Sequence, residues 1–169
     1  MIKKIVITGP ESTGKTTLAT QLAEVLDTLW VPEFARQYID ELERPYQEND
    51  LVEIAKGQIE AEQNFSEKAH QYLICDTDLI TLKIWSAYKY GRCHDFILNN
   101  IESRRYDYYF LAYPDIPWTY DPQRENPEDR LVLYDLYKSE LDFYQKPYFE
   151  LKGNEEERLV AAVKQIQQL

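Results

Sequence analysis

The sequence has few cysteines and no long hydrophobic run. Its two cysteines, Cys75 and Cys93, lack the spacing of a metal-binding motif, and we expect neither a metal site nor a disulfide there. No stretch approaches the ~20 apolar residues that cross a membrane. The apolar stretch after Lys3 and Lys4 is also too short for a signal peptide. The composition therefore predicts a cytoplasmic protein that does not enter a membrane.

Positive charge is also scarce. Lysine and arginine number 19 against 30 aspartates and glutamates, which gives a formal net charge of −11. Nucleic acids and anionic membrane surfaces attract lysine and arginine, so this balance argues against both kinds of partner. The length of 169 residues and a hydrophobic fraction of 44% are ordinary for one globular domain. We expect a single domain over residues 1–169, and the sequence carries no signal for an oligomeric state.

Residues 9–16, with the sequence GPESTGKT, fit the phosphate-binding pattern GxxxxGK[ST]. An apolar run at 2–7 precedes them and a helical pattern at 18–26 follows. A strand, a tight loop and a helix N-terminus direct several backbone N–H groups at one anion, whereas the alternative is an ordinary glycine-containing turn. Lys15 can reach the β- and γ-phosphates of ATP, and the Thr16 hydroxyl can bind Mg²⁺. The predicted ATP-binding residues are Gly9, Glu11, Ser12, Thr13, Gly14, Lys15, Thr16 and Thr17.

Predicted strands and helices alternate along the rest of the chain. The strands are expected at 3–8, 29–31, 72–76, 108–112 and 148–151. The helices are expected at 14–28, 34–42, 50–70, 79–90, 95–104, 128–144 and 155–168. Strands separated by helices indicate a parallel sheet with right-handed crossovers. We therefore predict an α/β fold, the three-layer sandwich of P-loop NTPases, with five parallel strands, helices on both faces and the phosphate loop at the carboxyl edge.

Two aspartates follow the third predicted strand. Asp76 ends an apolar run, as in the Walker B arrangement, and is expected to hold Mg²⁺ or one of its waters together with Thr16. Asp78 has two open interpretations. It either caps the next helix or contacts the acceptor or the metal.

Glu33 follows Pro32, which stops the second strand at the same edge of the sheet. A carboxylate there can accept a hydrogen bond from a substrate hydroxyl and orient it toward the γ-phosphate. Arg36 lies one helical turn further on, where it either joins the site or forms a surface ion pair with Glu33.

The segment 113–130 holds four of the eight prolines and is predicted to form a lid over the phosphates. Arg124 or Arg130 could neutralise charge on the transferring phosphoryl group. Trp118 could stack on a flat ring or pack the base of the loop. Both readings stay open.

Two residues on predicted helices are further candidates for substrate contact. Gln58 interrupts the apolar face of its helix, and a buried amide must find partners, either on the substrate or on a backbone group. Trp85, on the helix after Asp78, is either a core residue or a platform for the substrate.

Taken in order, these motifs resemble the ribosylnicotinamide kinase domain at the C-terminus of the bifunctional NAD-biosynthesis and regulator proteins of bacteria. The matching elements are Gly9 to Lys15, Glu33-Phe34-Ala35-Arg36, Gln58, Asp76-Thr77-Asp78, and Trp118 with Asp121 and Arg124. The resemblance runs nearly end to end. It implies ATP- and Mg²⁺-dependent phosphorylation of the nicotinamide riboside 5′-hydroxyl to nicotinamide mononucleotide.

In this reading Lys15 holds the ATP phosphates, Glu33 orients the acceptor with Asp78, and Arg124 or Arg130 closes over the phosphoryl group. The nucleoside-like substrate is expected to meet Arg36, Gln58, Trp85, Trp118 and Asp121. The alternatives are a kinase for another nucleoside or vitamin alcohol, and an ATP-binding sensor without useful turnover. Glu33 favours an enzyme, since a sensor needs no group that orients an acceptor.

Overall fold

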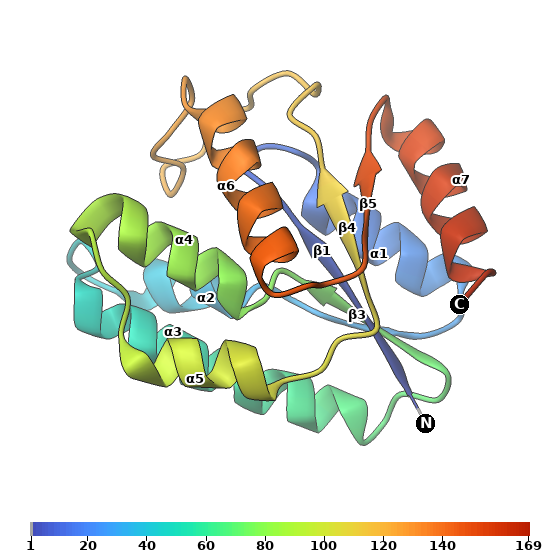
Figure 1. Cartoon of the computed structure of the whole chain (residues 1–169), viewed down its shortest axis with the longest axis horizontal. Helices are drawn as coiled ribbons and strands as arrows, with labels where there is room; N and C mark the ends of the chain where they lie inside the picture. The colour runs from blue at the N-terminus through green and yellow to red at the C-terminus, as the bar shows by residue number, and fades with distance from the viewer. Residues whose placement is uncertain (1) are drawn as a thin grey trace.

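The computed structural model describes residues 2–169 and contains one parallel sheet of five strands (Figure 1). The strands are β1 (Lys3–Thr8), β2 (Leu29–Val31), β3 (Tyr72–Asp76), β4 (Tyr108–Ala112) and β5 (Tyr148–Leu151). All five have the predicted bounds. Their order across the sheet is β2-β3-β1-β4-β5. The predicted α/β class and the parallel sheet are therefore confirmed.

Seven helices connect or follow these strands. They are α1 (Lys15–Val25), α2 (Phe34–Glu41), α3 (Glu48–Ser66), α4 (Leu79–Tyr90), α5 (Asp95–Ser103), α6 (Arg130–Phe143) and α7 (Glu155–Ile166). Most of them are shorter than predicted. Helix α1, for example, ends before residue 28 because Asp27 adopts a left-handed conformation, with a φ of 47°.

Helix α3 also begins two residues earlier than predicted. Its N-cap is Gln47, and the side chain of Asp50 accepts a hydrogen bond from the Gln47 N–H at 2.6 Å. Asp50 is only 5% exposed, and it also accepts hydrogen bonds from Arg44 and from the Tyr38 hydroxyl. A carboxylate in the first turn thus fixes both the start of α3 and the loop that precedes it.

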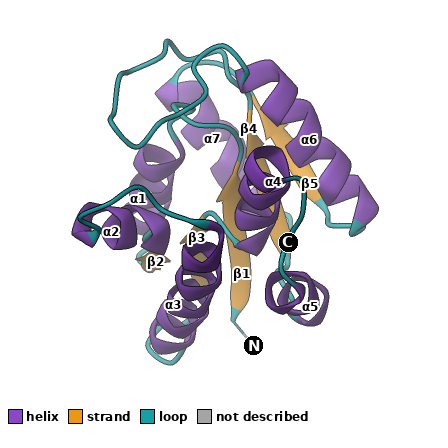
Figure 2. Cartoon of the chain, turned by 90° about the vertical axis from the view of Figure 1, so that its left-hand side faces the viewer, coloured by secondary structure: helices purple, strands orange, loops and turns teal. Residues whose placement is uncertain are grey.

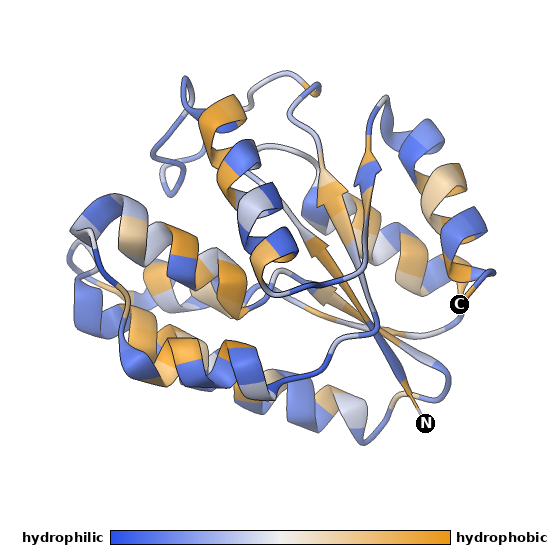
Figure 3. Ribbon diagram, in the orientation of Figure 1, coloured by the Kyte–Doolittle hydropathy of each residue, from blue (hydrophilic) through white to orange (hydrophobic). Residues whose placement is uncertain are grey.

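The helices cover both faces of the sheet, as predicted (Figure 2). Helices α1 and α7 pack on one face, where the core includes Ile5, Ile7 and Phe110. Helices α2 to α6 lie on the other face, with Val6 and Tyr109. Neighbouring strand residues therefore point into different cores, and both sides of each central strand are apolar, as is typical of parallel sheets (Figure 3). Within residues 2–169, no helix is long and apolar enough to cross a membrane.

The pairing of β1 with its two neighbours brings three strand ends to the same edge. In the parallel register Ile7 lies beside Asp76 on one side and Phe110 on the other. The chain leaves β1 at Gly9, whose φ is 136°. A Cβ atom at Gly9 would lie 2.8 Å from the Ala112 carbonyl oxygen, so only glycine fits between the end of β1 and the end of β4.

We predict that Asp50→Ala lowers the free energy of unfolding by about 1–2 kcal/mol, the usual cost of a lost N-terminal cap. The hydrogen bond from Arg44 holds the pKa of Asp50 below its usual range. A depressed pKa contributes stability above the unfolded-state pKa of about 4, and this contribution is lost as the pH falls. Urea unfolding at neutral and acidic pH measures it.

The matched control is Asp95→Ala, which removes an exposed carboxylate from the first turn of α5. It is expected to change the unfolding free energy much less. An equal loss in the two variants, or a loss for Asp50→Ala that does not shrink in acid, would contradict this account of the cap.

Candidate active site

The phosphate loop joins β1 to α1. Gly14 is the N-cap of α1, with a φ of 75°, and no side chain caps the helix. The backbone N–H groups at this helix end are therefore free to bind an anion. Inside the loop, the Thr13 hydroxyl donates to the Pro10 carbonyl oxygen at 2.8 Å, and Lys15 Nζ donates to the same oxygen at 2.7 Å. The loop thus already holds the curled shape that phosphate binding requires.

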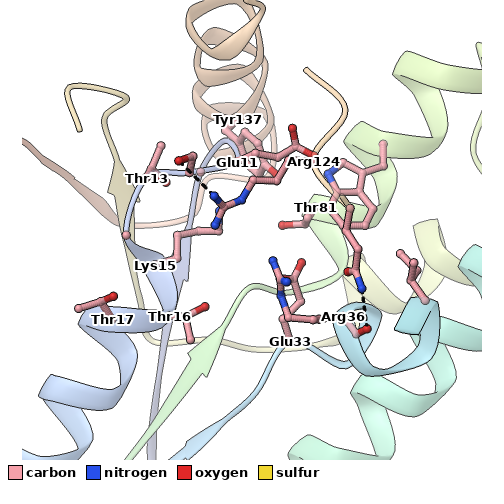
Figure 4. A pocket seen from close by; sticks show the side chains of 16 residues that line it. Glu11, Thr13, Lys15, Thr16, Thr17, Glu33, Arg36, Thr81, Arg124 and Tyr137 are labelled. Carbon is pink, nitrogen blue, oxygen red and sulfur yellow. Dashed lines mark hydrogen bonds between the residues drawn. The ribbon is translucent and has the colours of Figure 1, made fainter. Parts of the chain in front are cut away.

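An open pocket of about 740 Å³ lies over this loop. All eight predicted ATP-binding residues line its floor. Its walls come from helices α2, α4 and α6, from Glu33 just before α2, and from the segment 113–129. The wall residues are Glu33, Arg36, Ile39, Thr81, Trp85, Gln123, Arg124 and Tyr137. In Figure 4, Lys15 and Thr16 lie on one side of the pocket and Glu33 and Arg36 on the other, with Arg124 above.

Lys15 and Glu33 share this pocket and affect each other's charge. Burial lowers the pKa of Lys15, while the nearby carboxylates of Glu33, Asp76 and Glu11 counteract this effect. Burial and the negative charge of Asp76 raise the pKa of Glu33 to about 7, against the opposing charge of Lys15. A carboxyl group whose pKa lies near neutrality can accept a hydrogen bond or a proton from an alcohol under ordinary conditions.

Asp76 and Thr16 meet at the end of β3. The Thr16 hydroxyl donates to Asp76 Oδ2 at 2.6 Å, and Asp76 is 1% exposed. Its second oxygen, Oδ1, has no hydrogen-bond partner within residues 2–169. Burial raises the pKa of Asp76, a shift that a nearby cation would reverse. A carboxylate oxygen without a partner beside a hydroxyl fits a Mg²⁺ ion that takes its other ligands from phosphates and water.

Asp78 lies behind the pocket wall rather than in it. Asp78 Oδ1 accepts a hydrogen bond from the Ile80 N–H at 3.2 Å, and Oδ2 accepts one from the Tyr109 hydroxyl at 2.8 Å. Asp78 is buried, and burial raises its pKa to about 7. Of the two interpretations of Asp78, the structure shows the helix cap, because both carboxylate oxygens already have partners inside the protein.

Gln58 bonds to the backbone. Its Oε1 accepts a hydrogen bond from the Phe34 N–H at 2.9 Å, directly after Glu33. Of the two partners considered for its amide, the structure therefore shows the backbone group. Gln58 does not line the pocket over the phosphate loop.

The segment between β4 and α6 is fastened to the phosphate loop by main-chain groups. The Glu11 carboxylate accepts hydrogen bonds from the N–H groups of Glu125 and Asn126, and the Ser12 hydroxyl accepts one from the Thr119 N–H at 2.9 Å. Both side chains were predicted to contact ATP. Both also line the pocket over the loop, so these hydrogen bonds join the segment to the wall of the predicted ATP site.

The two arginines of this segment differ in position. Arg124 lines the pocket, whereas Arg130 donates to the carbonyl oxygens of Ser12 and Ile116 at 3.1 and 2.8 Å. Both guanidinium groups lie about 6 Å from the centre of the Trp118 ring, at 6.0 and 5.7 Å. Trp118 does not line the pocket, so here it packs the base of the segment.

Arg36 forms an ion pair with Asp121 at 2.8 Å, not the surface pair with Glu33 that was one alternative. Its partner lies across the pocket mouth on the segment 113–129, so the pair ties that segment to α2. Asp121 itself accepts from Arg36 and from the Gln123 N–H, and does not line the pocket. Trp85, by contrast, faces the pocket from α4.

A family model described as an AAA domain matches residues 4–158. The chain belongs to the AAA domain family.

A curated relative of this AAA domain is the trifunctional NAD biosynthesis/regulator protein NadR of Salmonella typhimurium. It is 30% identical over 130 residues, which are 73% of this chain and 31% of that protein. The AAA domain therefore spans about a third of the length of the curated relative that it matches.

Two solved structures resemble the fold. The crystal structure of NadR protein in complex with NR has a TM-score of 0.83 at 21% identity, over 99% of this chain and 51% of that one. Thymidylate kinase from Ehrlichia chaffeensis has a TM-score of 0.69 at 16% identity, over 98% of both chains. The AAA domain therefore shares its fold with both proteins.

Arg158, which belongs to none of the predicted motifs, supports the phosphate loop of this AAA domain from α7. Its guanidinium is 2% exposed and donates to the carbonyl oxygens of Thr13, Tyr113 and Gly153 at 2.6 to 2.8 Å, and to the Asp115 carboxylate. The available signal was its position on the buried stripe of α7, four residues before Ala162. A charged residue on such a stripe is expected to have polar partners.

We predict that Arg158→Met lowers the free energy of unfolding by about 3–5 kcal/mol, because it leaves buried carbonyl groups and Asp115 without a partner. Chemical denaturation measures the loss. The control is Arg105→Met, at an exposed position, which is expected to stay within about 0.5 kcal/mol of the parent. A similar small change at Arg158 would show that these contacts contribute little.

Proposed function

We propose that this chain is an ATP- and Mg²⁺-dependent kinase that phosphorylates the 5′-hydroxyl of nicotinamide riboside, giving nicotinamide mononucleotide. The observation that carries the proposal is that Lys15 and Glu33 face one pocket from two sides. One side suits the phosphates of ATP, and the other suits an alcohol. The name of the curated relative and the NR complex of the similar structure support nicotinamide riboside as the acceptor.

On the donor side, the free N–H groups of the loop and the Lys15 ammonium would bind the β- and γ-phosphates. Thr16 and Asp76 would hold Mg²⁺, which neutralises phosphate charge when bound. We assign Arg124 to the charge on the transferring group, since it lines the pocket over the loop and Arg130 does not.

On the acceptor side, Glu33 would accept the hydrogen bond of the 5′-hydroxyl and orient its oxygen toward the γ-phosphorus. A bond forms between that oxygen and phosphorus as the bond to the β–γ bridging oxygen breaks, and ADP leaves. The hydroxyl proton passes to Glu33 or to solvent. Since phosphoryl transfer needs little help from a strong base, positioning is the main contribution of this carboxylate.

A second pocket adjoins the first and suits the base of a nucleoside. The two share Glu11, Ile39, Trp85 and Gln123, and the second has a volume of about 740 Å³. Its other lining residues are Tyr46, Tyr88, Lys89, Glu125, Asn126 and Leu133. Lys89 already lies 3.8 Å from the centre of the Tyr46 ring and pairs with Glu125. The Trp85 ring makes no such contact with a cation among the described residues, and an aromatic face attracts a flat cationic ring such as the pyridinium of nicotinamide riboside. Trp85 is therefore proposed as a substrate-binding residue.

We also propose that the segment 113–130 is a lid of a single kinase domain. Its ties to Glu11, Ser12 and Arg36 all lie at the mouth of the site, where release of a few hydrogen bonds would open a path for substrates. A cytoplasmic location, where ATP is plentiful, remains the prediction from composition.

The test is an initial-rate assay of the purified chain with ATP and Mg²⁺ across nicotinamide riboside, common nucleosides and vitamin alcohols. A clear preference for nicotinamide riboside supports the proposal. Preference for a different acceptor supports kinase activity but rejects nicotinamide riboside as the substrate. Tight ATP binding without turnover of any acceptor favours the sensor alternative.

We predict that Lys15→Ala weakens ATP binding at least tenfold, because it removes the side-chain cation of the phosphate loop. Its melting temperature should stay near that of the parent, since Lys15 makes one hydrogen bond inside the loop. Lys56→Ala is the control, as Lys56 is exposed and pairs with Glu53 on its own helix. Calorimetric titration with an ATP analogue measures both. Unchanged affinity in Lys15→Ala would reject the phosphate-loop assignment.

We predict that kcat/KM of the parent falls as the pH drops through about 7, because Glu33 takes up a proton there and can no longer accept from the alcohol. Glu33→Gln should have a much lower kcat and no such step, with ATP affinity retained. Glu41→Gln, an exposed change on the same helix, should keep the parent profile. If Glu33→Gln retains both the rate and the step, Glu33 does not orient the acceptor.

A further inference from the structure

A small cavity lies beside Glu33, and no residue of the phosphate loop lines it. It is lined by Glu33, Gln58, Thr77, Asp78 and Thr81 together with apolar side chains. Its free volume is that of about one water molecule. Of these polar residues, Glu33 and Thr81 also line the pocket over the phosphate loop. The cavity therefore adjoins the group proposed to orient the acceptor.

Gln58 lines this cavity from α3, and only one end of its side-chain amide has a hydrogen-bond partner among the described residues. It is 3% exposed, and its Oε1 accepts the Phe34 N–H at 2.9 Å. That bond fixes which end of the amide is oxygen, because an amide nitrogen could not accept from an N–H group. Nε2 has no hydrogen-bond partner among the described residues. A buried donor without a partner costs about 1–3 kcal/mol, so a partner is expected at this point.

Glu33 is also without direct support for its side chain. It is the N-cap of α2, but its carboxylate makes no capping hydrogen bond, and no other side-chain hydrogen bond of Glu33 occurs within residues 2–169. Its position depends on the backbone around it. The Phe34 N–H that Gln58 binds belongs to the very next residue. A hydrogen-bond donor in the cavity is therefore placed to bind the Glu33 carboxylate.

We propose that Gln58 is a positioning residue for Glu33, acting through the Phe34 N–H and through one buried water molecule held between Gln58 Nε2 and the Glu33 carboxylate. The water accepts from Nε2 and donates to Glu33, and the hydroxyl of Thr81 and the groups of Thr77 and Asp78 complete its surroundings. This inference rests on the proposed role of Glu33. It assigns Gln58 no contact with substrate.

Substitutions at Gln58 separate its two hydrogen bonds. Gln58→Glu keeps an oxygen for the Phe34 N–H and, in its ionised form, has no hydrogen to donate to the water, whereas Gln58→Met loses both hydrogen bonds. Gln63 is exposed on the same helix, so Gln63→Glu and Gln63→Met make the matched controls. The readouts are kcat and KM for nicotinamide riboside and for ATP, with the melting temperature measured in parallel.

We expect Gln58→Glu to lower kcat about tenfold while KM for ATP stays within about twofold and the melting temperature stays near that of the parent. Gln58→Met should lower kcat at least as much and also lower the melting temperature. Both Gln63 variants should match the parent. Full kcat in Gln58→Glu, or a loss of kcat that only follows a loss of folded protein, would overturn the proposal.

A crystal structure of the protein without substrates tests the same proposal independently of activity. It should contain one ordered water within hydrogen-bond distance of both Nε2 and the Glu33 carboxylate, and a single Glu33 conformer. In Gln58→Met the water should be absent and Glu33 spread over several conformers. A dry cavity in the parent overturns the proposal. If the water is present but nicotinamide riboside is not phosphorylated, the proposed function fails while the support of Glu33 by Gln58 stands.

Discussion

The parallel pairing of β1 with β3 is the constraint on which the rest of the site depends. Because Ile7 lies beside Asp76, the carboxylate that ends β3 emerges where the chain leaves β1 for the phosphate loop, within 2.6 Å of the Thr16 hydroxyl. Strand β2 pairs with β3 and brings Glu33 to the same edge. A slip of one residue between β1 and β3 would turn Asp76 away from Thr16, since neighbouring strand residues point to opposite faces.

This edge brings three carboxylates close to the Lys15 ammonium. Glu11, Glu33 and Asp76 all act on the single ammonium of Lys15, and burial raises the pKa of both Glu33 and Asp76. Such an arrangement is unfavourable without ligands, and it becomes favourable when a cation is shared among the carboxylates and phosphates. Contacts outside this cluster of carboxylates offset the electrostatic cost. The buried guanidinium of Arg158 and the hydrogen bonds from the segment 113–129 to Glu11 and Ser12 hold the loop in shape.

Local signals in the sequence predicted much of this molecule. Apolar runs with turn residues at their ends predicted all five strands, and the spacing of the glycines and Lys15 predicted the position of the phosphate loop. What could not be predicted depends on contacts between distant segments. The partner of Arg36 is 85 residues away, and the Thr13 carbonyl bonded by Arg158 is 145 residues away. The choice between capping and substrate contact at Asp78 was likewise decided by Tyr109 on another strand.

The central claim is that phosphates bound at Lys15 meet an alcohol oriented by Glu33. The most direct measurement is the fate of the γ-phosphate when ATP, Mg²⁺ and nicotinamide riboside are incubated with the chain, followed by phosphorus NMR and mass spectrometry. The account predicts one ADP for each nicotinamide mononucleotide, with the phosphate on the 5′-oxygen. Release of inorganic phosphate at the same rate with and without the riboside would contradict it.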